Sequence, residues 1–374
     1  GRKGKVGYYK YRKNAKTGGE RMRKGKRLIA WIMAVVMLFT ICVFGGNRTA
    51  EAAATTPVAK NGRLSVKGAD LVDSKGNKFQ LRGISTHGIN WDVGSPYVNK
   101  KAFKTLRDDW GVNAIRLAMY TEEYNGYCSG GSQAKLRKLV DKGVGNATDL
   151  GMYAIIDWHI LSDGNPNKNK SQAKKFFTTM AKKYKNNKNV IYEICNEPNG
   201  CGWKEIKSYA TDIIKTIRKY DKKAVIIVGT PTWSQLGTDG TSNEVADSPI
   251  KGYKNIMYSL HFYASEWAHN EYLPAKVAYA RKKKLPIIVS EFGLSPASGD
   301  GAINKASADK WMKLLNKYNI SYFCWSLSNK NESASLLKPS TKKTSGWKSG
   351  DLSTAGKYIK KKYHARKKAL GKKA

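Results

Sequence analysis

Two glutamates, Glu197 and Glu291, each follow a short apolar segment and could act together in acid–base chemistry. Cleavage of a glycosidic bond uses such a pair, with one carboxyl group as proton donor and the other as nucleophile or as base for a water molecule. One of the two must then stay protonated near neutral pH while the other is ionised. A carboxylate after a strand more often only forms a salt bridge, so the pair alone leaves both interpretations open.

Polar residues elsewhere in the chain could tune such a pair. Arg116 could hold one carboxylate in its charged form through Coulombic attraction and hydrogen bonding. Tyr263 and the histidines could adjust protonation, or donate hydrogen bonds to a sugar or to the nucleophile. A separation of about 5 Å between the two carboxyl groups would give retention of the anomeric configuration, whereas a wider gap would admit water and give inversion. Both outcomes stay open at this point.

Aromatic residues also stand where a sugar ring could stack on them. Four are predicted at or just beyond strand ends, namely Trp91, Tyr120, Trp233 and Trp325. Because tryptophan is also common in protein cores, we assign Trp110 and Trp311, which lie on predicted helices, to the core. The group at the strand ends favours a carbohydrate-binding cleft.

The elements that must position these residues alternate between strands and helices from Leu64 onward. The predicted strands are 79–85, 114–118, 153–158, 190–195, 224–229, 256–262, 286–290 and 322–326. Segments of helical periodicity lie between most of them, at 132–150, 171–185, 204–220, 274–283 and 306–318, whereas a loop is predicted after Gly229. Eight such units predict an α/β fold, a (β/α)8 TIM barrel that forms a single catalytic domain. A doubly wound open sheet is the alternative, but no glycine-rich phosphate loop follows any strand.

The predicted barrel would bring the polar residues together. Catalytic groups of such barrels project from the C-terminal ends of the strands, and nearly all of the predicted strand ends carry polar or aromatic side chains here. Arginine and histidine inside an apolar sheet would be costly to bury unless a polar site satisfied them. We therefore interpret the strand ends as one functional site.

Residues from about 60 to 362 resemble glycoside hydrolase family 5, and within it the bacterial endoglucanase (cellulase) branch. The string N-E-P at 196–198 is highly specific for this family. Further matching strings are R-G-I-S-T-H-G-I-N-W at 82–91, L-R-D-D-W-G-V-N-A-I-R-L-A-M-Y at 106–120, I-I-D-W-H-I-L-S-D at 155–163, I-V-G-T-P-T-W-S-Q at 227–235, H-F-Y-A at 261–264, V-S-E-F-G at 289–293 and C-W-S-L-S-N-K-N-E-S at 324–333.

The resemblance implies a role for each matching residue. Glu197 would be the acid/base and Glu291 the nucleophile of an endo-β-1,4-glucanase with a retaining double-displacement mechanism. The sugar being cleaved would be surrounded by Arg116, His159, Asn196, His261, Tyr263 and Trp325, with Asn196 bonded to its 2-hydroxyl group. The glucan-binding cleft would be lined by His87, Trp91, Tyr120, Ala297, Ser298, Lys330 and Glu332. No metal and no cofactor are expected.

The sequence departs from the family pattern in two places. Phe292 stands where tryptophan is common, and the loop 264–270 differs from the usual one, which leaves the role of His269 open. The alternatives within the resemblance are a related retaining β-glycanase, namely a mannanase, xylanase or licheninase. A non-catalytic cell-surface carbohydrate-binding barrel is a further alternative from a different class, which the intact glutamate pair argues against.

The front of the chain has the pattern of a targeting segment. Residues 28–46 are apolar and uncharged, with basic residues before them and the string A-E-A-A-A at 50–54 after them. This order predicts a secretory signal peptide, with an outward-facing membrane anchor as the alternative. We expect a secreted protein that touches a membrane only through 28–46, if that segment is uncleaved. The expected divisions are 1–54 for tail and targeting segment, 55–62 for a linker, 63–363 for the barrel and 364–374 for a basic C-terminal tail.

The formal net charge of +40, from 68 basic and 28 acidic residues, suggests at first a nucleic-acid partner. The lysines, however, are spread along predicted helices, and no nucleic-acid-binding motif accompanies them. We interpret the charge as surface chemistry and expect a monomer that binds a β-glucan polysaccharide and no specific nucleic acid. Of the five cysteines, Cys128 and Cys201 lie in predicted loops and could form a disulfide in an exported protein.

Overall fold

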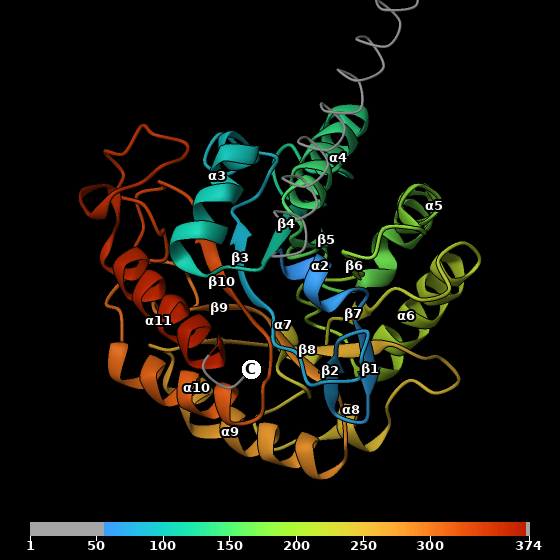
Figure 1. The fold of residues 1–374 in the computed structure, drawn as a ribbon. Helices are drawn as coiled ribbons and strands as arrows, with labels where there is room; N and C mark the ends of the chain where they lie inside the picture. The colour runs from blue at the N-terminus through green and yellow to red at the C-terminus, as the bar shows by residue number, and fades with distance from the viewer. Residues whose placement is uncertain (1–55, 372–374) are drawn as a thin grey trace, which may run out of the picture. The chain divides into compact units, whose positions relative to one another are not determined.

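Eight parallel strands close into a barrel within residues 56–371, the part of the chain that the computed structural model describes (Figure 1). In chain order they are β3 (Arg82–Thr86), β4 (Ala114–Tyr120), β5 (Tyr153–His159), β6 (Val190–Glu193), β7 (Ile226–Val228), β8 (Ile256–Tyr263), β9 (Ile287–Gly293) and β10 (Tyr322–Leu327). Each strand pairs with the next in sequence, and β10 pairs with both β9 and β3. The predicted (β/α)8 barrel is confirmed, and every predicted strand has its counterpart.

The barrel strands are buried along their whole length. One face of each strand points into the barrel and the other against the helices, so parallel strands of this kind need nearly continuous apolar runs. Most polar residues of the strands lie toward the C-terminal ends, as in His159 of β5 and Glu291 of β9. The sequence thus reserves the interior of one barrel end for polar groups.

Helices cover the outside of the barrel in Figure 1. The longer ones are α4 (Gln133–Asp149), α5 (Lys170–Tyr184), α6 (Trp203–Arg218), α9 (Trp267–Lys282), α10 (Lys305–Lys317) and α11 (Thr354–Gly371). Shorter elements are α2 (Pro57–Asn61), η1 (Ser95–Tyr97), α3 (Lys100–Thr105), η2 (Leu106–Trp110), η3 (Pro166–Asn169), α7 (Pro231–Ser234), α8 (Glu244–Asp247) and η4 (Ser349–Asp351). Two of them, α7 and α8, occupy the connection after Gly229 that the sequence predicts as a loop.

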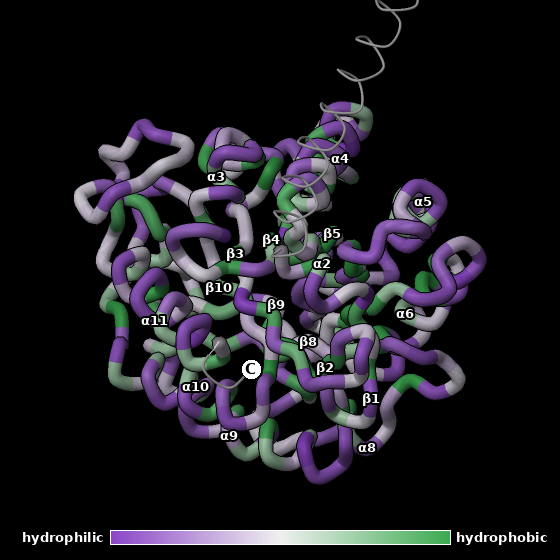
Figure 2. The backbone as a smooth tube through the Cα atoms, viewed as in Figure 1, coloured by the Kyte–Doolittle hydropathy of each residue, from purple (hydrophilic) through white to green (hydrophobic). Residues whose placement is uncertain are grey.

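Helix α6 shows how sequence and packing agree. Its buried residues recur every three or four positions, for example at Ile206, Ile213 and Ile217, which places them on one face of the helix. Its first turn is capped by Glu205, whose carboxylate accepts from the Gly202 N–H at 3.0 Å. Figure 2 shows hydrophilic stretches along the helices that surround the barrel, where the many lysines lie.

Helix α9 begins earlier than predicted. The sequence predicts a helical segment at 274–283, which starts at a proline, a residue common at the first helical position. The structure begins the helix at Trp267 and keeps Pro274 inside it. Proline removes one backbone donor and disfavours the helix interior, yet the neighbouring Leu273 and Val277 are buried against the core. Tertiary packing therefore outweighs the local preference.

A two-stranded hairpin adjoins the N-terminal end of the barrel. Strands β1 (Ser65–Lys67) and β2 (Asp70–Val72) pair in antiparallel fashion, and Leu71 packs in one apolar cluster with residues that begin the barrel strands, such as Tyr153 and Phe323. This second core separates that end of the barrel from solvent. The polar end is the opposite one.

The predicted linker and C-terminal tail coincide partly with ordered elements. Helix α2 lies inside the segment 55–62, and the Val58 N–H donates to the Gly151 carbonyl at 2.9 Å. Helix α11 continues to Gly371 and so includes most of the segment 364–374. Within residues 56–371, no helix is long and apolar enough to cross a membrane. The predicted targeting segment 28–46 lies outside the described residues.

Candidate active site

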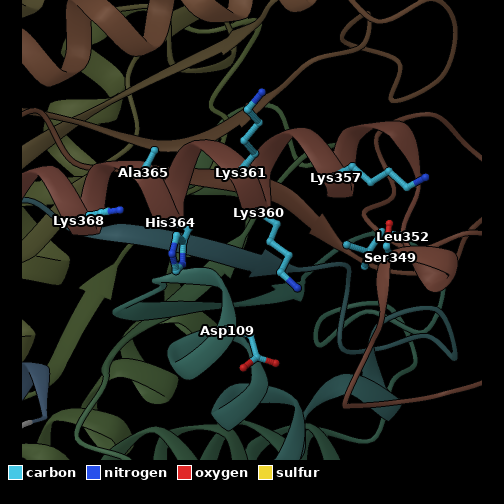
Figure 3. A pocket seen from close by; sticks show the side chains of 9 residues that line it. All are labelled: Asp109, Ser349, Leu352, Lys357, Lys360, Lys361, His364, Ala365 and Lys368. Atoms are coloured by element: carbon cyan, nitrogen blue, oxygen red, sulfur yellow. The ribbon is translucent and has the colours of Figure 1, made fainter.

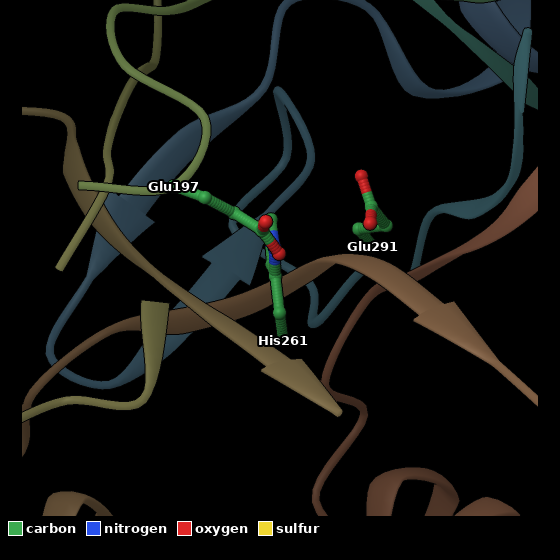
Figure 4. Close-up of side chains that lie close together, drawn as sticks. All are labelled: Glu197, His261 and Glu291. Atoms are coloured by element: carbon green, nitrogen blue, oxygen red, sulfur yellow. The ribbon is translucent and has the colours of Figure 1, made fainter. Parts of the chain in front are cut away.

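The two predicted catalytic glutamates face one another at the C-terminal end of the barrel. Glu197 lies in the loop after β6, and Glu291 lies on β9. Three atoms lie within 4.8 Å of one another, namely a carboxylate oxygen of Glu197, a carboxylate oxygen of Glu291 and a ring nitrogen of His261. Figure 4 shows the Glu197 side chain reaching toward His261, with Glu291 beside them. The strand register brings this about, because His261 on β8 is the pairing partner of Glu291 on β9.

Glu291 is held by two donors. The Arg116 Nη1 atom lies 2.8 Å from its Oε2 atom, and the Tyr263 hydroxyl donates to its Oε1 atom at 2.7 Å. Tyr263 fits so closely because Gly293 lies against its ring: a Cβ atom at Gly293 would stand 2.5 Å from a ring carbon. A guanidinium and a hydroxyl both donate to the carboxylate and so fix its orientation. Glu291 is therefore held in one orientation at the centre of the site.

Arg116 also connects Glu291 to other residues. Its Nε donates to Glu193 Oε2 at 2.8 Å, its Nη2 donates to Asn196 Oδ1 at 2.6 Å, and the Asp157 Oδ2 atom lies 3.1 Å from Nη2. Burial alone would lower the pKa of Arg116, but the carboxylates of Asp157, Glu193 and Glu291 raise it well above its ordinary value. Arg116 is thus a permanent buried cation at the centre of the site.

Glu197 has a different environment. Its side chain is 13% exposed, and its Oε1 atom lies 2.8 Å from His261 Nδ1. Burial raises the pKa of Glu197 to about 8, an effect that Arg116 reduces and that Asp157 and Glu193 reinforce. Glu197 is therefore protonated near neutral pH while Glu291 is paired with a cation, which is the division of roles that a proton donor and a nucleophile need.

His159 links the site to the aromatic wall. Its Nδ1 atom lies 2.6 Å from Asp157 Oδ2, and its Nε2 atom lies 3.3 Å from Asn196 Nδ2. Burial, followed by the Arg116 charge, lowers the pKa of His159 to about 3, so the ring is neutral. The Trp325 ring stacks on it with 5.2 Å between centroids and 14° between planes.

The predicted cleft residues form a second group beside the glutamates. The rings of Trp91 and Tyr120 stack at 4.5 Å, and the His87 ring lies 4.9 Å from that of Trp325. Glu332 contacts His87 Nε2 at 3.6 Å and Lys330 Nζ at 2.6 Å. Ala297 and Ser298 lie in the loop after β9, which is joined to the loop after β10 by a hydrogen bond from the Ala334 N–H to the Gly299 carbonyl at 2.9 Å. Among the interactions of residues 56–371, the predicted residues that contact Glu197 or Glu291 directly are Arg116, His261 and Tyr263, and the cleft residues do not.

The connection after β7 presents Trp233 on an unusual turn. Thr232, Trp233 and Ser234 have φ values of 57°, 53° and 62°, a left-handed conformation that costs roughly 1–2 kcal/mol per residue for side chains with a Cβ atom. The turn is tied to the segment that carries Glu197, because Ser234 Oγ donates to the Asn196 carbonyl at 2.7 Å and the Trp233 N–H donates to the Pro198 carbonyl at 2.9 Å. Trp233 remains 48% exposed. An exposed indole held on a strained turn beside the site is suited to contact a ligand.

Sequence reasoning assigned no role to three residues of the site's inner layer. Asp157 and Glu193 contact Arg116, and Ser290 Oγ lies between Glu193 Oε1 at 2.7 Å and His261 Nε2 at 2.8 Å. All three are fully buried. The available signal was a charge inside an apolar run, as in V-I-Y-E-I-C at 190–195, since a buried carboxylate requires a partner. Tyr124, in the loop after β4, and Trp267, the first residue of α9, were also missed as exposed aromatic residues.

Glu197, His261 and Glu291 also offer atoms that could ligate a metal ion. Their donors are used within the protein, however. His261 Nδ1 is paired with Glu197, and the Glu291 carboxylate is paired with the Arg116 guanidinium. A fixed cation beside the cluster would repel a metal ion. We therefore interpret the three residues as groups for proton transfer and carbon attack.

Comparison with known proteins identifies the family. The family described as "Cellulase (glycosyl hydrolase family 5)" matches residues 72–331. The chain belongs to glycosyl hydrolase family 5. An endoglucanase of Clostridium saccharobutylicum is 47% identical to this family 5 chain over 339 residues, which are 90% of this chain and 72% of that protein. Endoglucanase A of Butyrivibrio fibrisolvens is 45% identical over 302 residues, or 80% and 68% of the two chains.

Solved structures agree. The catalytic domain of Thermobifida fusca endoglucanase Cel5A (E5) superimposes on this family 5 chain with a TM-score of 0.76 at 37% identity, covering 83% of this chain and 99% of that one. Cellulase Cel5C_n superimposes with a TM-score of 0.77 at 39% identity, covering 83% and 94%. The predicted resemblance to this family is confirmed, and the chain is a glycoside hydrolase.

The two departures from the family 5 pattern have structural explanations. Phe292 is buried and stacks on Phe262 with 5.2 Å between ring centroids, so it serves packing behind the barrel wall. His269 Nδ1 accepts a hydrogen bond from the Tyr263 N–H at 2.9 Å. His269 therefore holds the end of β8 in place and supports Tyr263 from behind.

The cysteines of the described region are free thiols. Cys128 and Cys201, which the sequence suggested as a disulfide pair, are both unpaired and partly buried. Burial raises the pKa of each thiol, to about 12 for Cys128 and about 11 for Cys201. Neither is a reactive thiolate at neutral pH.

A pocket of about 720 Å³ lies away from the family 5 site (Figure 3). It is lined by residues of η2, η4 and α11, including Asp109, Lys357, Lys361, His364 and Lys368. The basic residues recur at helical spacing along the exposed face of α11. None of the residues that line it belongs to the polar cluster at the strand ends, so we place the chemistry at that cluster.

Proposed function

We propose that the protein is an endo-β-1,4-glucanase that hydrolyses internal bonds of a β-glucan with retention of the anomeric configuration. The observation that carries this proposal is the distance between the two glutamates, whose nearest carboxylate oxygens lie within 4.8 Å. Retaining enzymes hold the two groups about 5 Å apart, whereas inverting enzymes need roughly 6.5–9.5 Å to admit water. The opposite environments of Glu197 and Glu291 support the same assignment.

In the first step, a Glu291 oxygen attacks the anomeric carbon while Glu197 transfers its proton to the departing glycosidic oxygen. The bond between carbon and leaving oxygen breaks, and a covalent glycosyl-enzyme forms. Arg116 and Tyr263 position the attacking carboxylate through the contacts of 2.8 and 2.7 Å described above. Asn196, whose amide lies between Arg116 and His159, would bond with the sugar 2-hydroxyl.

In the second step, Glu197, now ionised, removes a proton from a water molecule. The resulting hydroxide attacks the anomeric carbon, and the bond between that carbon and the Glu291 oxygen breaks. Two inversions at the same carbon restore the original configuration. Glu197 regains its proton and Glu291 its charge, so the site returns to its starting state.

Exposed aromatic residues on several loops support cleavage within a chain rather than at its end. Tyr124, Trp233 and Trp267 follow three different strands and are 87%, 48% and 68% exposed. Rings on separate loops can hold successive sugars on an open surface. The stacked pair of Trp91 and Tyr120, with His87, Lys330 and Glu332, supplies a further proposed subsite next to the glutamates.

We also propose that the protein is exported. The order of basic residues, the apolar segment 28–46 and the small residues at 50–54 supports this. N-terminal sequencing of the extracellular protein would then begin near residues 52–55. Recovery of the enzyme from the cytoplasm with residues 28–46 attached would contradict export.

A substrate panel tests the proposed activity. Carboxymethylcellulose, barley glucan, xylan and mannan are compared by the release of reducing ends and by the fall in viscosity. We expect the glucans to be cut, and the viscosity of carboxymethylcellulose to fall before many ends appear. Activity confined to xylan or mannan would replace the glucanase assignment with one of the related β-glycanases.

A further inference from the structure

The inner layer of the site contains a chain of hydrogen bonds that determines which way each group donates. It begins at Glu193, whose two oxygens face Arg116 Nε at 2.8 Å and Nη2 at 3.3 Å. A carboxylate that accepts from both arms of a guanidinium is an acceptor only. The Ser290 hydroxyl, 2.7 Å from Glu193 Oε1, must therefore donate its single proton to that oxygen.

The next link is the His261 ring. Its Nε2 atom lies 2.8 Å from Ser290 Oγ. Since the Ser290 proton is already directed at Glu193, Ser290 can only accept here, and His261 must carry a proton on Nε2. Burial lowers the pKa of His261 to about 4, with a further lowering by Arg116 that Glu291 and Glu193 oppose. The neutral ring then has a bare Nδ1 atom.

The last link is Glu197. A bare Nδ1 at 2.8 Å from Glu197 Oε1 can only accept, so the bond requires a proton on the Glu197 carboxyl group. We propose that Ser290 and Glu193 are positioning residues that fix His261 as the Nε2–H tautomer and thereby keep the catalytic proton on Glu197. This inference rests on the proposed role of Glu197 as the acid.

The same geometry helps the second step. When Glu197 has given up its proton, its charge faces the Nδ1 lone pair across the same short distance. That repulsion makes the carboxylate a stronger base toward water, because it is relieved when the proton returns. One fixed tautomer thus keeps Glu197 protonated for the first step and favours recovery of its proton from water in the second.

His159 provides a contrast within the same site. Asn196 Oδ1 accepts from Arg116 at 2.6 Å, so Asn196 Nδ2 is the donor toward His159 Nε2 at 3.3 Å. His159 must then carry its proton on Nδ1, where Asp157 Oδ2 lies at 2.6 Å. The two histidines are therefore expected to be opposite tautomers.

Nitrogen NMR of the intact protein tests the tautomers directly. The chain has only 5 histidines, so long-range proton–nitrogen spectra of protein labelled with ¹⁵N-histidine can be assigned with one histidine variant at a time. We expect His261 protonated on Nε2 and His159 on Nδ1 at pH 7. A proton on His261 Nδ1, alone or in a doubly protonated ring, would overturn the proposal. The spectrum does not depend on activity, so it separates this inference from the proposed function.

Variants at Ser290 test the consequence for the acid. The groups that face His261 are Glu193 and Glu197 from β6 and its loop, Ser290 and Glu291 from β9, and Arg116 from β4. Ser290→Ala removes the acceptor for Nε2–H and frees the ring to donate to Glu197. The pKa of Glu197 should then fall, because its protonated form loses a hydrogen bond that favoured it. The alkaline limb of the pH profile of kcat/KM on glucan should move down by about one pH unit.

Two matched variants complete the test. Ser290→Thr keeps the hydroxyl, so the alkaline limb of its pH profile of kcat/KM should match that of the parent. Ser259→Ala removes a neighbouring hydroxyl, 3.0 Å from Ser290 Oγ, but leaves the bond from Ser290 to Glu193, so its limb should not move. If Ser290→Ala folds, as judged by thermal melting, and keeps both the parent tautomer and the parent limb, Ser290 has no positioning role. If it does not fold, the NMR spectrum of the parent decides alone.

Discussion

Arg116 and Glu291 are 175 residues apart in the chain, yet Arg116 Nη1 lies 2.8 Å from Glu291 Oε2 at the centre of the barrel. The same guanidinium contacts Glu193 and Asn196, which flank the segment leading to Glu197. One buried cation therefore fixes Glu291 relative to the segment that carries Glu197. Including the bond to Ser85 Oγ, Arg116 donates five hydrogen bonds, so all of its N–H groups are used within the site.

Replacement of this arginine should affect both catalysis and stability. Arg116→Lys keeps a charge but cannot make forked contacts, so kcat/KM on glucan should fall at least about 100-fold. Arg116→Ala leaves buried carboxylates unpaired, which should lower the free energy of unfolding by about 3–5 kcal/mol. Steady-state kinetics and denaturant unfolding measure the two effects. Arg137→Lys, at a partly buried position on α4, is the control. A similar loss of kcat/KM in this variant would show that the effect of Arg116→Lys is not specific to the site.

The role of Glu197 predicts a pH dependence and a leaving-group dependence. Since its pKa is raised to about 8 and the acid must be protonated, kcat/KM on glucan should fall as the pH rises through about 8. Glu197→Gln should be nearly inactive on glucan. It should retain more of the first step on an aryl glycoside, whose phenolate leaves without a proton, and added azide should partly rescue the second step.

Glu291→Gln is the matched comparison. Because it lacks the nucleophile, it should lose activity on every substrate, and added azide should not restore that activity. General acid help is typically worth 10²–10⁴-fold, so the difference between the two variants is measurable. Identical behaviour of the two variants on both substrates would mean that the catalytic pair is wrongly assigned.

The raised pKa of Glu197 also predicts a cost in stability. Folding raises this pKa from 4.5 to about 8, so between these values the native protein holds a proton that the unfolded chain releases. The contribution of Glu197 to the free energy of unfolding therefore falls as the pH rises from about 4.5 to 8. Glu197→Gln, which does not ionise and can still donate to His261, should melt at a higher temperature than the parent at pH 7 and at a similar one at pH 4. A lower melting temperature at pH 7 would contradict the protonated buried acid.

Trp233 should contribute to binding of the glucan and not to chemistry. It is exposed on the left-handed turn after β7, and its backbone N–H is bonded to Pro198. Trp233→Ala should raise KM for a long glucan several-fold while kcat changes little, as expected when a stacking contact of about 0.5–1.5 kcal/mol is lost. Trp267→Ala, on α9, should raise KM in the same direction, because Trp267 is also proposed to hold a sugar. A loss in kcat alone would place Trp233 in the chemical step instead.

The sequence predicts the barrel well because its parallel strands are buried on both faces, so that runs such as 153–156 stand out from the lysine-rich helices between them. It also predicts most of the site, since the ends of parallel strands must meet. The start of α9 was misplaced because packing of Leu273 and Val277 overrides the usual position of proline.

The inner layer of the site was harder to predict. Glu193 and Ser290 lie within strands, and their importance comes from partners on β4 and β8 that no local pattern reveals. Which glutamate is the acid is likewise a property of the surroundings. Only the three-dimensional contacts give Glu291 a guanidinium and a tyrosine while Glu197 has a histidine.

The stereochemistry of the first product tests whether Glu197 and Glu291 act as a retaining pair. Proton NMR can follow the anomeric signals of a short β-1,4-glucan oligosaccharide during the first minutes of hydrolysis, before mutarotation mixes the two forms. With the carboxylate oxygens within 4.8 Å of one another, the β-anomer should appear first and the α-anomer only later. If the α-anomer appears first, a water molecule attacks the sugar directly and the assignment of Glu291 as nucleophile is wrong.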